Sequence, residues 1–170
     1  LGTVRQLAAQ YLATLPTLDR EDVPRDVDVQ PPPGVVQKTV RRGVEPKAQV
    51  QITFHGELEG YSFETESALQ VLGDVLQTRL REELREERGG VYFVRVEPMS
   101  WREPRPEYRF TVGFGTDPER VDELIGAVMD AIAEIKTEGP EARYVENVRE
   151  SARRAEETNR RENGYWLRAL

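Results

Sequence analysis

Cysteine is absent from this sequence of 170 residues, and histidine occurs once, at His55. Without cysteine, the chain can form no disulfide and offers no thiolate to a metal ion. The usual zinc sites combine several His or Cys ligands, so one histidine among scattered carboxylates does not make such a site. We therefore predict that this chain holds no metal ion of its own. His55 occupies a polar position in an alternating segment, which is typical of a surface histidine.

The sequence also lacks long apolar runs and an excess of positive charge. No apolar run approaches the roughly 20 residues of a membrane-spanning helix, and no secretory signal peptide is visible. The net charge is −7, with 32% charged and 38% apolar residues. Nucleic-acid-binding proteins need a concentrated basic surface to displace counterions. The composition thus predicts a globular protein that neither binds nucleic acid nor inserts into a membrane.

The length suits one domain with a real core, and we predict a single α+β domain over residues 1–170. The sequence starts without an initiator Met inside a helical pattern, and it finishes as GYWLRAL without a stop signal. This predicts a piece of a longer polypeptide. Residues 16–34 are rich in Pro and Asp and contain PPPG, so we predict an extended surface connector there.

Hydrophobic periodicity predicts the order helix, strand, strand, helix, strand, strand, helix, helix. The expected helices cover residues 1–15, 69–88, 121–138 and the charged region after 140, and the expected strands cover 35–43, 48–58, 92–97 and 108–114. The strands alternate between apolar and polar residues, so one face of the sheet should be buried. The economical fold is an α+β two-layer sandwich, with helices packed on one face of a largely antiparallel sheet.

The segment FGTDPE precedes the helix expected from residue 121. Its glycine could suggest a phosphate-binding turn, but the carboxylates of Asp117 and Glu119 would repel an anion there. Capping explains the segment better. Either Thr116 and Glu119 form a capping box, or Asp117 caps the helix with Pro118 in the first position.

The stretch LREELREERGGVYFV, residues 80–94, joins a charged helix to a strand. Its charge order is poorly tuned for a helix, because like charges such as Arg81 and Arg85 stand four residues apart. Only Arg79 with Glu83 and Glu82 with Arg85 are favourable pairs at helical spacing. The weak stabilisation indicates that some of these charges have another purpose.

Arg85 lies in the last helical turn and Tyr92 at the start of the strand. The Gly89–Gly90 turn between them folds the chain back, so we expect both polar tips to meet at one rim of the sheet. A guanidinium and a phenol together offer donors to carbonyl oxygens, which is what a site that holds a peptide backbone requires.

The sequence resembles the insulinase/pitrilysin family of zinc metallopeptidases, the inverzincins, and in particular its bacterial, PqqL-like branch. The resemblance covers nearly the whole chain and depends on the order and spacing of several segments. These segments are YLATLP, VQITFHG, LQVLGDVLQTRLREELRE, LREERGGVY, FGTDPERVDELI, EIKTEGP and RRENGYWL.

The resemblance implies a division of labour between two halves of a longer protein. In this family an H-x-x-E-H motif in the N-terminal half holds the zinc ion and supplies the glutamate base. The present sequence lacks that motif, so it resembles a domain of the C-terminal, non-zinc half, inactive on its own. The family's C-terminal half contributes an Arg and a Tyr that grip the substrate backbone. The matching residues here are Arg85 and Tyr92, whose implied role is to position the scissile peptide.

The implied parent is a zinc endopeptidase, and the implied partners are its zinc-binding half and a peptide or protein substrate. Two alternatives remain open from the residues. The chain could belong to a non-catalytic peptidase-like subunit that binds peptides, or to an unrelated interaction module in which Arg85 and Tyr92 are ordinary surface groups. The sequence indicates no compartment. Export to the periplasm is compatible with the resemblance, and so is the cytoplasm.

Overall fold

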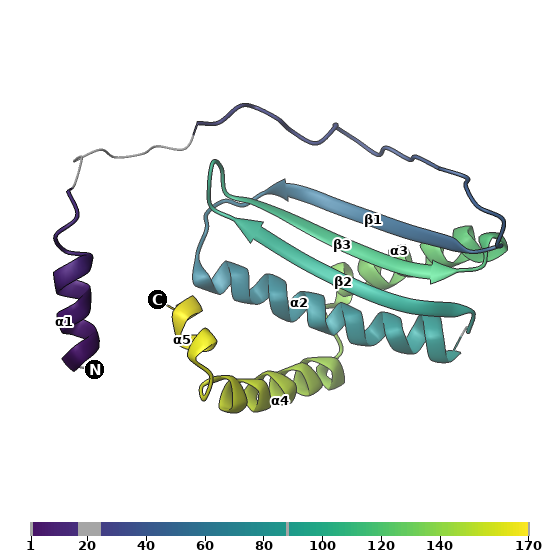
Figure 1. Ribbon diagram of the computed structural model, residues 1–170. Helices are drawn as coiled ribbons and strands as arrows, with labels where there is room; N and C mark the ends of the chain where they lie inside the picture. Colours follow the sequence, from purple (N-terminus) through teal and green to yellow (C-terminus); the bar gives the residue numbers. More distant parts are fainter. Residues whose placement is uncertain (1, 17–24, 88, 170) are drawn as a thin grey trace.

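The computed structural model describes residues 2–16, 25–87 and 89–169. Its elements, drawn in Figure 1, are α1 (Gly2–Tyr11), β1 (Ala48–Glu57), α2 (Phe63–Arg81), a π-helix η1 (Glu82–Glu87), β2 (Val91–Trp101), β3 (Glu107–Thr116), a 3₁₀-helix η2 (Pro118–Arg120), α3 (Val121–Glu138), α4 (Ala142–Asn159) and α5 (Asn163–Ala169). The first helix is shorter than predicted, since it ends at Tyr11 instead of reaching residue 15.

The strands of the described residues form one antiparallel sheet with the order β1-β3-β2. Helices α2 and α3 cover the same face of this sheet, and α4 lies against α2 on the side away from it (Figure 1). This is the predicted α+β architecture of helices packed on one face of an antiparallel sheet. The opposite face of the sheet has no helix over it in the described part of the chain.

Alternation along β1 and β3 sets which face is buried, as predicted. In β1 every second residue is partly buried, and the polar residues between them, including His55, are exposed. In β3 the side chains of Phe110, Val112 and Phe114 face the helices and are buried. They meet Leu80 of α2 and apolar residues of α3 in one core. Truncating a leucine in such a core costs about 2–5 kcal/mol.

Two segments differ from the sequence prediction. The strand expected over residues 35–43 does not form, and residues 25–47 contain no helix or strand. The loop expected after residue 97 is shorter, because β2 continues to Trp101 and includes Pro98. A proline is tolerated there because β2 is an edge strand, where a missing backbone N–H breaks no ladder hydrogen bond.

Ion pairs connect the segment before β1 to the loop between β2 and β3. Arg105 of that loop lies 3.2 Å from a carboxylate oxygen of Asp26 and 3.6 Å from one of Asp28. Residues 25–34 of the predicted connector contain neither helix nor strand, which agrees with an extended segment. Residues 17–24 of the predicted connector lie outside the described residues, so the connector over 16–34 and the single-domain boundary stay predictions.

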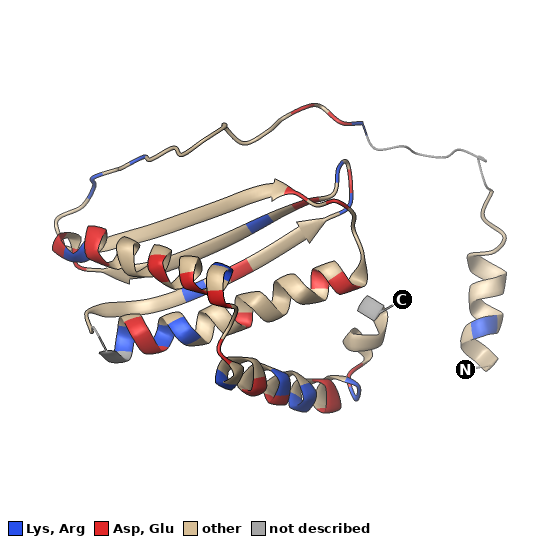
Figure 2. Cartoon of the chain, turned by 180° about the vertical axis from the view of Figure 1, so that it is seen from behind, with Lys and Arg blue, Asp and Glu red and all other residues tan. Residues whose placement is uncertain are grey.

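Helix α4 presents charges of both signs along its length (Figure 2). Arg153 and Arg154 both pair with Glu150, at 3.2 and 2.9 Å. Both arginine side chains are largely exposed and Glu150 is partly exposed, so this face of α4 is solvated. Exposed pairs of this kind contribute about 0–1 kcal/mol each.

Candidate functional site: the turn between η1 and β2

The end of the α2 helix changes from α to π hydrogen bonding before the glycine turn. The sequence predicts continuous α-helix to residue 88, but residues Glu82–Glu87 form the π-helix η1. Within it, Leu84 is fully buried in the core and the neighbouring Arg85 is exposed. Short π segments widen a helix by one residue per turn and occur frequently at functional sites. Arg85 lies within this π segment.

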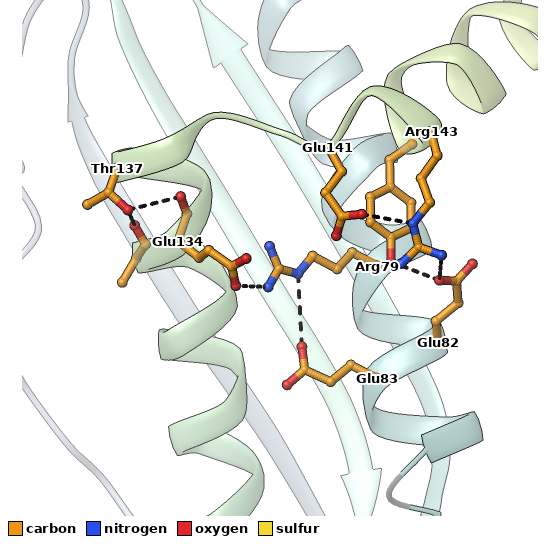
Figure 3. Close-up of polar contacts among 9 residues, drawn as sticks. Arg79, Glu82, Glu83, Glu134, Thr137, Glu141 and Arg143 are labelled. Atoms are coloured by element: carbon orange, nitrogen blue, oxygen red, sulfur yellow. Dashed lines mark hydrogen bonds and ion pairs between the residues drawn. The ribbon is translucent and has the colours of Figure 1, made fainter.

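The other charges near this helix end cross-link the helices, as Figure 3 shows. Arg79 contacts Glu83 at 4.0 Å, as predicted, and also binds Glu134 of α3. The predicted pairing of Glu82 with Arg85 is wrong, because Glu82 is engaged by α4 instead. Its carboxylate accepts a hydrogen bond from the hydroxyl of Tyr144 at 2.8 Å.

Arg85 makes no hydrogen bond or ion pair with any described residue. The guanidinium carries five N–H donors in a fixed fork and accepts none. An exposed fork that has no partner among the described residues suits a carbonyl or carboxylate oxygen of another molecule.

Tyr92 is the extra residue of a β-bulge. In the pairing of β2 with β3, Val91 stands opposite Thr116 and Phe93 opposite Gly115, so Tyr92 has no partner of its own. The bulge inverts the alternation at this point, because Val91 is buried while Tyr92 and Phe93 are both exposed. In a regular strand the spacing of Tyr92, Val94 and Val96 would place all three on one face, and the bulge removes Tyr92 from that face. Bulges often re-aim a side chain beside an active site.

The hydroxyl of Tyr92 donates a hydrogen bond to Oδ1 of Asp117. This bond to a carboxylate, together with desolvation, raises the pKa of Tyr92 above its ordinary value. A phenol has a single O–H group to donate, and here Asp117 accepts that hydrogen bond. The ring remains half-exposed, at 54%, and its oxygen presents lone pairs to an incoming group.

Asp117 is the N-cap residue of the 3₁₀-helix η2 and Pro118 follows it in the first turn, as one of the two alternatives predicted, but the predicted side-chain capping bonds of Asp117 and Thr116 do not form. The side chain of Asp117 makes no capping hydrogen bond although it precedes the 3₁₀-helix η2. Thr116 is fully buried, and its Oγ1 donates to the carbonyl of Gly90 at 2.9 Å. Both side chains are directed to the turn that carries Tyr92.

The turn itself consists of two glycines in the left-handed region. Gly89 has φ +66° and Gly90 has φ +73°, values that residues with a Cβ rarely adopt. Arg120 Nη1 donates to the carbonyl of Gly89 at 2.6 Å. Sequence reasoning missed Arg120 and the turn-binding role of Thr116, since both lie in a segment whose composition is that of a helix start.

Arg85 and Tyr92 therefore flank one held turn at the end of the sheet. The direct approach of their two tips stays a prediction. No group of three or more His, Cys, Asp or Glu side chains suited to a metal ion occurs among the described residues. Within those residues, no helix is both long and apolar enough to cross a membrane.

Comparison with known proteins gives the class of protein. The family model of the Peptidase M16 inactive domain matches residues 2–152. Among curated proteins, the chain is 28% identical over 177 residues to a zinc protease PQQL-like of Arabidopsis thaliana, covering 95% of this chain and 18% of that protein. A plant relative and a bacterial fold neighbour both match, so the bacterial branch stays a prediction.

Two solved structures share the fold. The periplasmic protease PqqL from Escherichia coli matches with a TM-score of 0.63 and 21% identity, over 72% of this chain and 14% of that one. A mutant of the ferredoxin protease FusC, solved in complex with Arabidopsis ferredoxin, matches with a TM-score of 0.59 and 20% identity, over 72% and 13%.

The chain belongs to the insulinase/pitrilysin family as a copy of its inactive domain, which confirms the resemblance seen in the sequence. It spans about a fifth of the length of the curated relative. The zinc protease name of the curated relative implies a zinc ion in the parent protein.

Proposed function

We propose that this chain presents Arg85 and Tyr92 to a peptide or protein substrate, which zinc in another domain of the same polypeptide hydrolyses. The observation that carries the proposal is the bulge at Tyr92. It turns the phenol outward at the turn that also follows the exposed, unpaired guanidinium of Arg85. A protein substrate is supported by the related fold of a protease solved with ferredoxin bound.

A peptide unit offers one acceptor, the carbonyl oxygen, and one donor, the N–H. Arg85 supplies donors for the carbonyl. Tyr92 supplies oxygen lone pairs while its O–H group donates to Asp117. It can donate this hydrogen bond to a substrate oxygen instead when that oxygen displaces Asp117. Such a pair orients the scissile bond and stabilises charge that develops on its oxygen.

Substitution in the full-length protein tests this role. We expect Arg85→Ala and Tyr92→Phe each to lower kcat/KM by about 100-fold, the typical effect of removing one oxyanion donor. Bound zinc and the thermal transition should stay at wild-type values, because neither side chain is in the core. Cleavage of an internally quenched decapeptide and zinc content by atomic absorption provide the measurements.

Arg154→Ala on α4 is the matched control, since it removes an equally exposed arginine away from the turn. Unchanged cleavage by both Arg85→Ala and Tyr92→Phe, or a loss of zinc in either, would contradict the proposal. Arg85→Lys should recover only part of the activity, because an ammonium cannot form the two parallel hydrogen bonds of the guanidinium.

A further inference from the structure

Residues 116–123 run from the last residue of β3 through η2 into the first turn of α3, and side chains of this segment hold the glycine turn. We propose that Arg120, braced by Glu123, is a positioning residue of the peptidase reaction that fixes the turn between Arg85 and Tyr92. This inference rests on the proposed function of that pair.

Arg120 reaches across from η2 to the backbone of the turn. Its Nη1 donates to the carbonyl of Gly89 at 2.6 Å, and its Nε and Nη2 donate to the two carboxylate oxygens of Glu123 at 3.1 and 2.9 Å. The two-point contact with Glu123 fixes the plane of the guanidinium, so Nη1 is directed at the glycine turn. Glu123 thus orients Arg120, and Arg120 orients the turn.

The guanidinium also packs directly over the second glycine of the turn. A Cβ placed on Gly90 would collide with Nη1 of Arg120. The positive φ favours glycine at this position, and the Arg120 guanidinium occupies the space beside it. The contact is therefore part of the shape of the turn and not a loose surface pair.

The neighbouring side chains support the same reading. Thr116 and Asp117 stand where a helix start usually has its caps, and a cap contributes about 1 kcal/mol. Thr116 binds the carbonyl of Gly90 and Asp117 binds the phenol of Tyr92, and Asp117 makes no capping bond. Together with Arg120, three side chains of one short segment converge on residues 89–92.

A turn of two glycines needs such support because it has many accessible backbone conformations. If the contacts of Arg120 are lost, Gly89 and Gly90 sample alternatives, and the residues on either side move with them. A displacement of about 1 Å in a substrate-positioning group can lower a rate by about 100-fold. Arg120 would thereby act through Arg85 and Tyr92 without touching the substrate.

The test uses Arg120→Ala and Arg120→Lys in the full-length protein, with the same quenched decapeptide. We expect Arg120→Ala to lower kcat by about 10- to 100-fold with KM changed less than about threefold, because orientation of the scissile bond is lost. Arg120→Lys keeps one donor for Gly89 and should recover to within about fivefold of wild type. Arg154→Ala should have no effect.

Coupling separates positioning from general loss of structure. In a protein that already carries Arg85→Ala and Tyr92→Phe, adding Arg120→Ala should lower kcat no more than about twofold further, since residues that act as a unit are not additive. The inference would be overturned if Arg120→Ala lowered kcat in that background by as much as it does in the wild-type protein. A wild-type kcat for Arg120→Ala alone would overturn it as well. If Arg85→Ala and Tyr92→Phe are themselves silent while Arg120→Ala is not, the proposed function fails instead.

Discussion

Among single residues, Tyr144 combines deep burial with two charged partners. Its side chain is 3% exposed, its hydroxyl donates to Glu82 and accepts from Arg143, and the Arg143 guanidinium lies 4.3 Å from the ring centroid. Burial, and then the hydrogen bond to Glu82, raise the pKa of Tyr144 to about 12. The hydroxyl therefore connects α4 to the end of α2 as a neutral donor.

The raised pKa predicts how stability depends on pH. The folded state holds the phenol proton more tightly than the unfolded state, so this contribution is complete below about pH 10 and is lost between about pH 10 and 12. We expect Tyr144→Phe to lower the free energy of unfolding by about 1 kcal/mol near neutral pH, the worth of a hydrogen bond. The difference in the free energy of unfolding between Tyr144→Phe and wild type should shrink as the pH rises above about 10.

Urea unfolding of both proteins at several pH values measures this difference. Tyr11→Phe, at an exposed position of α1, is the control and should follow wild type throughout. A deficit for Tyr144→Phe that stays constant from about pH 9 to 11.5 would show that the hydroxyl does not titrate as its burial implies.

Among elements, α2 packs so closely on β2 that one helix position must be glycine. A Cβ on Gly73 would lie 2.6 Å from Cγ of Pro98, which is too close for two carbon atoms. Gly126 of α3 is the opposite case, because nothing lies within 4 Å of an added Cβ. We expect Gly73→Ala to destabilise by about 1–3 kcal/mol through overpacking, and Gly126→Ala to stabilise by about 0.5–1 kcal/mol through helix propensity.

Thermal and urea unfolding of the two variants compare the same chemical change in two helices. Stabilisation by Gly73→Ala would mean that Pro98 moves away at no cost and that the helix–sheet contact is loose.

The elements also show where sequence reasoning succeeds and where it stops. Apolar spacing located α2 and α3, because burial of one helix face requires that spacing. A step of four residues, as from Leu80 to Leu84, is close to one turn in both α- and π-helices, so the leucine spacing gave no sign of η1. The run Val91 to Val94 suits a strand at every position, so composition gave no sign of the bulge that turns Tyr92 outward.

The candidate site was predictable only in part for the same reason. Arg85 and Tyr92 were found because a glycine turn lies between them and because the family resemblance marked them. The contacts of Tyr92 with Asp117 and of Arg120 with Gly89 join residues 25 and 31 positions apart in the chain. The local sequence pattern predicted that the side chain of Asp117 caps a helix, but this side chain accepts a hydrogen bond from Tyr92 instead.

At the scale of the whole molecule, we expect hydrolysis by the parent protein to depend on zinc and this domain to fold without it. The chain has no cysteine and one histidine, and no metal-binding cluster occurs among its described residues. We therefore expect EDTA or added zinc to leave the thermal transition of the 170-residue chain unchanged. The full-length protein should lose peptide cleavage in EDTA and regain it when zinc returns.

Thermal unfolding followed by circular dichroism is sensitive enough to decide this. A ligand that binds only the folded state at 100 times its dissociation constant adds about 2.7 kcal/mol, and each kcal/mol shifts the midpoint of a chain this long by about 2–4 °C. A zinc site in the chain would thus raise the midpoint by several degrees. A shift of that size would contradict the assignment of zinc to another domain. An unchanged midpoint for the 170-residue chain, together with zinc-dependent cleavage by the full-length protein, would agree with that assignment.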